Sequence, residues 1–325
     1  AEGGKEAGPW PRAFAHRGWH IGELAGMENS LSSFRAAEAE GFRYIETDVH
    51  ATADGVVVVH HDADLARTTD GRGAIRRLPW RAVSQARIGG VEPVSRLDDV
   101  LEEFPDLLWN IDIKAARLLR VVRRHDAWHR VCLASFDETT LETLRRRGDN
   151  RMLTSMGGRS ARILWTASRY GGWPLRKYAR GFAAQVPQAR GRLRVVDPQF
   201  IRQAHHWGVE VHVWTVDDAD DMVALLDQGV DGLVTDRPDV LRLFFSNVDS
   251  SWVTNSPFPG NHRMIVNAEL NDGESGVVRL SVTRTGWTMK PLPVEAGERE
   301  RMSVRDSGPR PDIVKRREQR GWCWY

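Results

Sequence analysis

The sequence predicts a distorted (β/α)8 TIM barrel with a small inserted lobe and a C-terminal extension. Three observations lead to this expectation. Short β-branched runs alternate with amphipathic helical stretches from Phe14 to about Leu243, which is typical of a parallel sheet covered by helices. Eight such runs fit within about 230 residues, the size of one barrel. Polar residues end several runs, at the positions where barrel enzymes carry their catalytic groups.

The expected elements follow in chain order. The eight expected strands are 13–17, 43–49, 56–60, 107–113, 131–136, 151–155, 209–216 and 231–235. The expected helices are 30–40, 97–104, 115–125, 138–147, 198–207 and 218–228. Segment 49–55 is too short for a crossover helix, and its Asp54-Gly55 pair is typical of a turn. We therefore expect the barrel to be irregular between its second and third strands.

The domain organisation predicted from this pattern is one barrel over 13–245 and an extension over 246–325. Residues 63–95, rich in arginine and turn residues, exceed a simple loop and are expected to form a small lobe over the barrel mouth. The extension lacks the βα rhythm. Its first part alternates apolar and polar residues around Asp272-Gly273, which favours a hairpin, and its charged end is expected to be a disordered tail.

Composition limits the classes of partner. Lys+Arg 46 against Asp+Glu 44 gives a net charge of +2, which offers no strong attraction to nucleic acid or to an anionic membrane. The two cysteines, Cys132 and Cys323, lack metal-ligand spacing. No apolar run approaches the roughly 18 residues of a transmembrane segment. We expect a cytoplasmic protein, although a cleaved signal peptide would leave the same sequence; the oligomeric state is not predicted.

Three carboxylates are candidate metal ligands. Glu46 and Asp48 lie two residues apart on an expected strand, so their side chains face the same side. Two like charges at one place are costly unless a cation lies between them. Asp112 on the fourth expected strand would add a third carboxylate, and Mg²⁺ and Ca²⁺ both take carboxylate oxygens. The competing interpretation is a structural salt bridge with Arg or Lys.

Two histidines from different strands are candidate acid–base groups. His16 and His61 end the first and third expected strands, and histidine titrates near neutral pH. His60 is interpreted as a packing residue because adjacent strand residues point in opposite directions. His50 is either a supporting partner of the acids or a loop residue.

Two cations, Arg17 and Lys114, are expected beside acids at the same mouth of the barrel. Arg17 offers a planar fork for phosphate oxygens and Lys114 offers a point charge. Each alone could equally balance neighbouring acids. Together with a metal and two histidines they indicate a phosphate ester, because phosphodiester cleavage requires charge withdrawal and a proton donor for the leaving oxygen.

These motifs resemble those of the glycerophosphodiester phosphodiesterases, which are metal-dependent distorted (β/α)8 barrels. The resemblance covers about residues 13–243. It runs through AHRGW, then MENSLSSFRAAEAEGFRYIETDVHATADGVVVVHHDADLARTTD, then WNIDIK, VCLASFD, VHVWTVDD and DGLVTDRPDVL.

The resemblance implies a role for each matched residue. It implies that His16 and His61 are the catalytic pair, that Glu46, Asp48 and Asp112 bind a divalent metal ion, Mg²⁺ or Ca²⁺, and that Arg17 and Lys114 contact the phosphate. It also implies that Trp214 lines the pocket and that the E-N pair Glu28 and Asn29 touches the site or shapes the loop before the first helix.

Two positions depart from the family pattern. Met27 stands where proline is usual, which loosens that turn. Asp112 stands where glutamate is commoner, and aspartate there is also found in the similar spider-venom phospholipases D. The identity of the metal and of the head group is therefore left open.

The function implied is hydrolysis of glycerophosphodiesters to glycerol 3-phosphate and an alcohol. One alternative is a lysophospholipase D, for which the Trp- and Leu-rich segment 161–182 could supply an acyl groove. A second is a catalytically inactive barrel that binds phosphate ligands. A third is a metal-independent phosphatidylinositol phospholipase C, which the three carboxylates disfavour.

Overall fold

The computed structural model describes residues 11–113, 117–171 and 173–244, together with the backbone of 263–269, 275–283 and 286–291. The chain divides into two compact units, with the boundary between Arg242 and Leu243. Among the described helices, none has the length and apolar character needed to cross a membrane.

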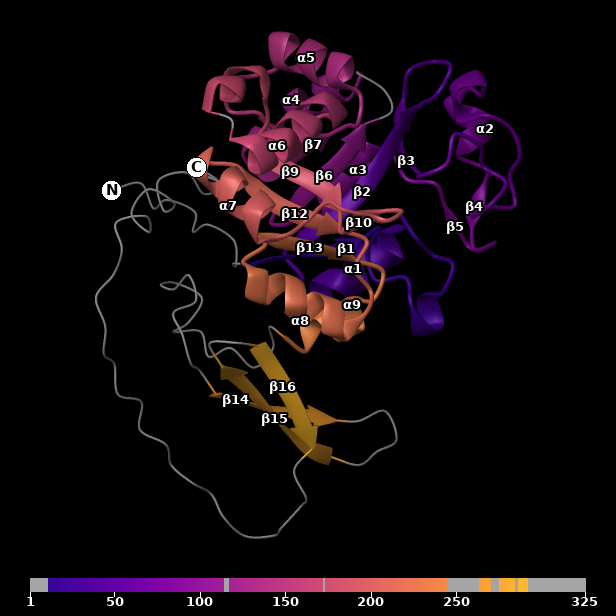
Figure 1. The fold of residues 1–325 in the computed structure, drawn as a ribbon. Helices are drawn as coiled ribbons and strands as arrows, with labels where there is room; N and C mark the ends of the chain where they lie inside the picture. The colour runs from indigo at the N-terminus through magenta and orange to yellow at the C-terminus, as the bar shows by residue number, and fades with distance from the viewer. Residues whose placement is uncertain are drawn as a thin grey trace, which may run out of the picture. The chain divides into compact units, whose positions relative to one another are not determined.

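The first unit is a nearly closed barrel of parallel strands (Figure 1). Hydrogen-bonded neighbours follow the order β8, β7, β6, β2, β1, β13, β12 and β9, and a parallel bridge from Ser155 to Ala183 links the two ends. The barrel strands are β1 (Arg12–His16), β2 (Tyr44–Ala51), β6 (Leu108–Ile113), β7 (Val131–Ala134), β8 (Leu153–Thr154), β9 (Ala183–Pro187), β12 (Glu210–Trp214) and β13 (Gly232–Thr235). The predicted (β/α)8 barrel is confirmed.

One of the eight predicted barrel strands is wrong. Segment 56–60 forms β3 (Val57–Val59), which pairs antiparallel with β2 and so turns back along it. The short connection forces this result, since a parallel strand needs a crossover of about a dozen residues. The eighth barrel strand is instead β9, which was not predicted because its sequence, AAQVP, has a single β-branched residue and ends in proline.

Helices cover the outside of the barrel. They are α1 (Leu31–Ala39), α3 (Leu97–Glu103), α4 (Leu118–Arg124), α5 (Glu138–Arg147), α6 (Gly158–Tyr170), α7 (Pro198–His206), α8 (Ala219–Gln228) and α9 (Pro238–Arg242). All six predicted helices are present within a few residues of their expected ends, whereas α6 and the short α9 were not predicted. Side chains of Ser30, Asp137, Asp197 and Asp218 accept backbone N–H bonds at four helix starts, which satisfies donors that a helix leaves open. Short 3₁₀ turns are η1 (Gly22–Leu24), η3 (Ala127–Arg130) and η4 (Trp173–Tyr178).

A buried ion pair crosses the barrel interior below the mouth. Arg12, 2 % exposed, donates to both carboxylate oxygens of Glu210 at 2.8 and 2.9 Å and to the Tyr44 hydroxyl. His212 lies 2.9 Å from the same carboxylate. These bonds compensate charges that would otherwise be costly to bury.

The inserted lobe (residues 63–95) has an apolar core of its own. It contains η2 (Ile75–Arg77), α2 (Trp80–Val83) and the antiparallel pair β4 (Arg87–Ile88) and β5 (Glu92–Pro93), and lies beside the barrel (right in Figure 1). Leu65, Ile75, Val83 and Ile88 pack there. Met27, which stands where the resemblance led us to expect proline, packs into this core from the barrel side and adds an apolar contact to the lobe.

A second contact joins the lobe to the barrel. The Glu92 carboxylate accepts hydrogen bonds from the backbone N–H groups of Leu31 and Ser32 at the start of α1, at 2.8 and 3.3 Å. An acidic side chain at a helix N-terminus accepts hydrogen bonds from N–H groups that have no partner within the helix. Its negative charge also interacts favourably with the positive end of the helix dipole.

The second unit contains a small antiparallel sheet. Its strands are β14 (Arg263–Glu269), β15 (Ser275–Thr283) and β16 (Gly286–Pro291). The pair β14–β15 flanks the predicted turn at Asp272-Gly273. That turn, and the tail predicted to be disordered, lie outside the described residues.

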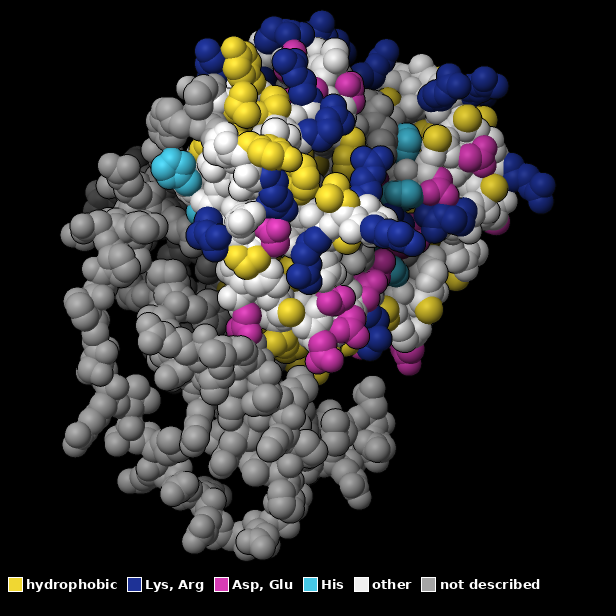
Figure 2. Space-filling view, in the orientation of Figure 1, with side chains coloured by type: hydrophobic (Ala, Val, Ile, Leu, Met, Phe, Trp, Pro, Cys, Tyr) yellow, Lys and Arg dark blue, Asp and Glu magenta, His cyan; other side chains and the backbone are white. Residues whose placement is uncertain are grey.

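A β10–β11 hairpin (Ala189–Arg190 and Leu193–Arg194) follows β9 at the mouth of the barrel. The space-filling view shows Lys and Arg side chains near histidine side chains on the face turned to the viewer (Figure 2).

Candidate active site

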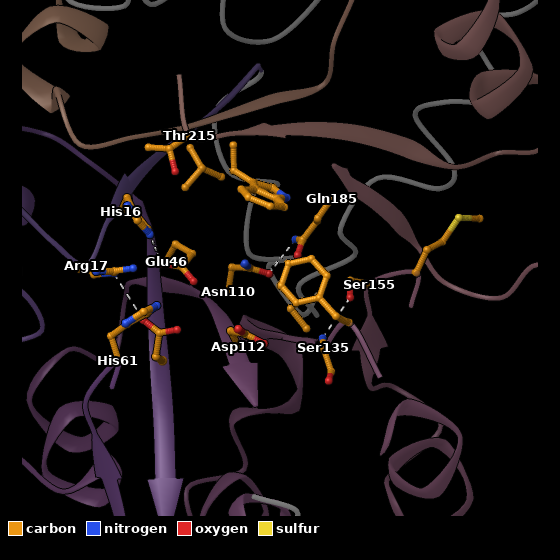
Figure 3. A pocket seen from close by; sticks show the side chains of 16 residues that line it. His16, Arg17, Glu46, His61, Asn110, Asp112, Ser135, Ser155, Gln185 and Thr215 are labelled. Carbon is orange, nitrogen blue, oxygen red and sulfur yellow. Dashed lines mark hydrogen bonds and ion pairs between the residues drawn. The ribbon is translucent and has the colours of Figure 1, made fainter. Parts of the chain in front are cut away.

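The barrel mouth encloses a cavity of about 190 Å³ (Figure 3). Most of the residues selected from the sequence line it, namely His16, Arg17, Glu46, Asp48, His61, Asp112 and Trp214. Glu28 does not line the cavity, and Lys114 lies in segment 114–116, outside the described residues.

The three carboxylates come from two neighbouring strands. Glu46 and Asp48 share one face of β2, and Asp48 lies directly beside Asp112 in the register of β2 with β6. Asn29, held in the left-handed region at φ 61°, accepts a hydrogen bond from the Thr47 hydroxyl at 2.7 Å and lies 3.5 Å from Asp48 Oδ2. The loop before α1 therefore fixes the backbone between the acids.

The chemistry of this donor set fits a hard divalent cation. All three groups offer carboxylate oxygens, which Mg²⁺ and Ca²⁺ prefer, and Glu46 and Asp48 are buried. Within the described residues, no three His, Cys, Asp or Glu side chains form a ready-made cation cage. The three carboxylates therefore fit such a cation, because they offer the ligand type that it prefers and because they line one cavity.

His16 is held by a carboxylate that sequence analysis missed. Its Nδ1 lies 2.6 Å from Oδ1 of Asp236, and its Nε2 lies 3.6 Å from Glu46 on the cavity side. His20 shares Asp236 at 3.2 Å. Burial alone would raise the pKa of Asp236, but the hydrogen bonds from the two histidines outweigh it and hold the pKa well below its usual range. The available signal was that Asp236 directly follows an expected barrel strand.

His61 is held in the same way. Its Nδ1 lies 2.6 Å from Oδ1 of Asp62, whose pKa is well below its usual range, first because of the hydrogen bond from Arg67. His50 Nε2 lies 3.0 Å from the backbone carbonyl of His61. His60 is buried, does not line the cavity, and contacts the Thr68 hydroxyl at 3.0 Å. This placement agrees with its interpretation as a packing residue.

Arg17 lies between two carboxylates. Its backbone is in the left-handed region at φ 56°, and its N–H donates to the carbonyl of Glu46 at 2.8 Å. The guanidinium donates to Glu28 at 2.9 Å and lies 3.5 Å from Asp48. Glu28 therefore does not line the cavity itself but contacts Arg17, which does.

Apolar and amide side chains complete the cavity. The ring of Phe136, 63 % exposed, meets Trp214 edge-on at 5.5 Å, and Met156 also lines the wall. Gln185 on the unpredicted strand β9 donates to Asn110 at 2.7 Å. Of the described residues in 161–182, none lines the cavity, so the apolar wall comes from other loops than sequence analysis suggested.

Comparison with known proteins gives a consistent assignment. The sequence model of the glycerophosphoryl diester phosphodiesterase family matches residues 16–240. A Mycobacterium tuberculosis protein named "Probable glycerophosphodiester phosphodiesterase 2" is 42% identical over 245 residues, 71% of this chain and 89% of that protein. A lysophospholipase D of Rattus norvegicus is 23% identical, over 74% of this chain and 87% of its own length.

A solved structure also supports the fold. An Oleispira antarctica phosphodiesterase, in complex with the product sn-glycerol-3-phosphate, is 21% identical with a TM-score of 0.57, covering 70% of this chain and 94% of that chain. The family model matches most of the chain, and the mycobacterial protein is 42% identical to it. This chain therefore belongs to the glycerophosphoryl diester phosphodiesterase family.

Proposed function

We propose that this protein is a metal-dependent phosphodiesterase that hydrolyses glycerophosphodiesters to glycerol 3-phosphate and an alcohol. The observation that carries the proposal is the convergence of His16, His61, Arg17 and three carboxylates on one cavity in a member of this family. The product bound by the Oleispira antarctica protein supports the identity of the phosphate product.

The proposed metal ligands are Glu46, Asp48 and Asp112, with Mg²⁺ or Ca²⁺ as the ion. When bound, the cation withdraws negative charge from the phosphate group. The side chain of Arg17 would contact phosphate oxygens while Glu28 holds its other edge. Lys114 remains a proposed second phosphate contact, and Trp214 a proposed wall of the substrate pocket.

The two histidines are proposed to transfer protons. Each has Nδ1 against an aspartate, which leaves Nε2 for the reacting groups. One histidine accepts a proton from the attacking hydroxyl, which is water or the glycerol hydroxyl of the substrate. The other donates a proton to the leaving oxygen as its bond to phosphorus breaks. A cyclic phosphate formed by the glycerol hydroxyl would then be opened by water.

A lysophospholipase D activity is the second candidate. It is favoured by the exposed ring of Phe136 beside Trp214 and Met156 at the mouth, which offers apolar surface for an acyl chain. Relatives named lysophospholipase D point the same way. Parallel assays with glycerophosphocholine and lysophosphatidylcholine separate the two candidates, since only the second substrate gains from an apolar wall.

The proposal is tested with a panel of glycerophosphodiesters in Mg²⁺, Ca²⁺ or chelator, reading out glycerol 3-phosphate. We expect chelator to abolish turnover and His16→Ala and His61→Ala each to lower kcat by about 10²- to 10⁴-fold. The exposed His206→Ala variant serves as the control and should behave as wild type. Turnover that survives chelator would refute the metal, and turnover that survives both cavity substitutions would refute the acid–base pair.

A further inference from the structure

Arg67, in the inserted lobe, joins two carboxylates beside the cavity. Its Nη1 and Nη2 donate to the two oxygens of Glu28 at 2.8 and 2.7 Å. Its Nε and Nη2 donate to the two oxygens of Asp62 at 2.6 and 3.1 Å. One planar guanidinium therefore binds both acids in fork-to-fork geometry, which fixes orientation as well as charge.

Each acid passes its orientation to a different group of the proposed site. Glu28 also accepts from Arg17 at 2.9 Å, and Asp62 holds Nδ1 of His61 at 2.6 Å. Arg67 itself does not line the cavity. Two series of contacts therefore start from Arg67. One leads through Glu28 to Arg17, the proposed phosphate contact, and the other leads through Asp62 to His61, a proposed catalytic histidine.

The backbone around Arg67 is well anchored. Leu65 is buried in the lobe core, and Thr68 contacts the buried His60 at 3.0 Å. Thr69 also bonds through its hydroxyl to the carbonyl of Leu65 at 2.6 Å. These contacts on both sides of Arg67 determine where its side chain leaves the lobe.

We propose that Arg67 is a positioning residue, through which the inserted lobe sets the orientation of both Arg17 and His61. This inference rests on the proposed function, because it assigns a purpose to the lobe in that reaction. Glu28 supports it: burial alone would raise the pKa of this acid, but Arg67 and Arg17 lower it to about 2. The acid is therefore ionised and held between the two guanidinium groups throughout the working pH range.

The competing interpretation is an ordinary surface salt bridge. Exposed ion pairs contribute little to stability, and the Arg67 side chain is 46% exposed. However, Glu28 is only 13% exposed. The lobe is also held to the barrel independently, through Met27 and through Glu92 at the start of α1. Loss of Arg67 should therefore disturb the two oriented groups without detaching the lobe.

The variants Arg67→Ala and Arg67→Lys test the inference in the full-length chain, with Arg72→Ala as a control on the same lobe. We expect Arg67→Ala to lower kcat/KM on glycerophosphocholine by about 10- to 100-fold, the range found when outer partners of a site are removed. Lysine keeps the charge but not the fork, so Arg67→Lys should recover only part of the loss.

Single substitutions separate the two series of contacts. Glu28→Gln should mainly raise KM through Arg17, and Asp62→Asn should mainly lower kcat through His61. The double variant Arg67→Ala/Asp62→Asn should have a kcat no lower than that of Asp62→Asn, because both residues act on His61 through the same series of contacts. Additive losses in kcat would overturn the inference.

A spectroscopic readout keeps this test independent of turnover. The proton on Nδ1 of His61, identified in NMR spectra by its absence in His61→Ala, should shift in Arg67→Ala and stay unchanged in Arg72→Ala. An unmoved signal together with kcat/KM within twofold of wild type would refute the positioning role. If the wild type hydrolyses no glycerophosphodiester, the proposed function fails, and the His61 signal alone decides whether Arg67 orients the ring. Melting temperatures identify any variant that is merely unfolded, and Glu28→Gln then gives the second measurement.

Discussion

Both cavity histidines are paired with an aspartate, and the two pairs differ in how far apart their members lie in the chain. Asp62 directly follows His61, whereas Asp236 and His16 are separated by 220 positions. Strand-end position and side-chain alternation were enough to select His16, His61 and the acids of β2 from the sequence. The partnership of His16 with Asp236 was not predicted, because it requires combining two inferences: that the closed barrel pairs β1 with β13 and that the residue directly after the last strand turns toward His16.

We predict that Asp236→Asn lowers kcat by about 10²-fold or more. An amide can neither stabilise the imidazolium form of His16 nor fix its tautomer as an anion does. Steady-state kinetics on glycerophosphocholine with saturating metal provide the measurement. Asp239→Asn, on the same segment but paired with the exposed Arg237, is the matched control. Equal kcat values for the two variants would contradict the role of Asp236.

Among the elements, those with strong local patterns were predictable. Helices with clear caps and apolar spacing were predicted within a few residues, and segment 63–95 contributes residues to an apolar cluster that also includes Met27 and Val58. Strand β3 was misjudged because a continuous run of valines is typical of a buried parallel strand, although the short connection over 49–55 leaves no room for a parallel crossover. Strand β9 was missed because its place in the sheet comes from pairing with β12, a tertiary contact that overrides weak propensity.

For the lobe, we predict that Ile75→Ala lowers the free energy of unfolding by about 2–5 kcal/mol and Ile75→Val by about 0.5–1.5 kcal/mol. Ile75 is completely buried in the lobe core, so the larger truncation leaves the larger cavity. Urea denaturation of both variants gives the ranking. Equal stability of Ile75→Ala and wild type would show that the lobe packs less tightly than its burial indicates.

The whole molecule combines a barrel that carries the proposed site with a second unit whose purpose the sequence did not suggest. Every described residue that lines the cavity belongs to the first unit. Division into a barrel over 13–245 and an extension over 246–325 remains a prediction about independent folding.

We therefore predict that a chain ending at residue 244 keeps kcat/KM on glycerophosphocholine within a few-fold of the full-length protein. The measurement compares both chains at equal concentration, with circular dichroism to verify that the shortened chain is folded. A complete loss of turnover in a folded shortened chain would show that the second unit belongs to the catalytic machinery.

Because β3 turns back along β2, some residues of the proposed site are close together in the sequence, whereas others are far apart. Glu46, Asp48 and His61 lie in one short segment that contains the β2–β3 hairpin, whereas His16 reaches Asp236 only when the ring of strands is closed. Contacts between residues near in sequence form sooner than contacts between distant segments, because the distant ones must first overcome the entropy of closing a long loop. During refolding from denaturant we therefore expect the acids and His61 to become neighbours before His16 meets Asp236, an order that hydrogen-exchange labelling during refolding measures, and hydrolysis should return only when the ring of strands is closed.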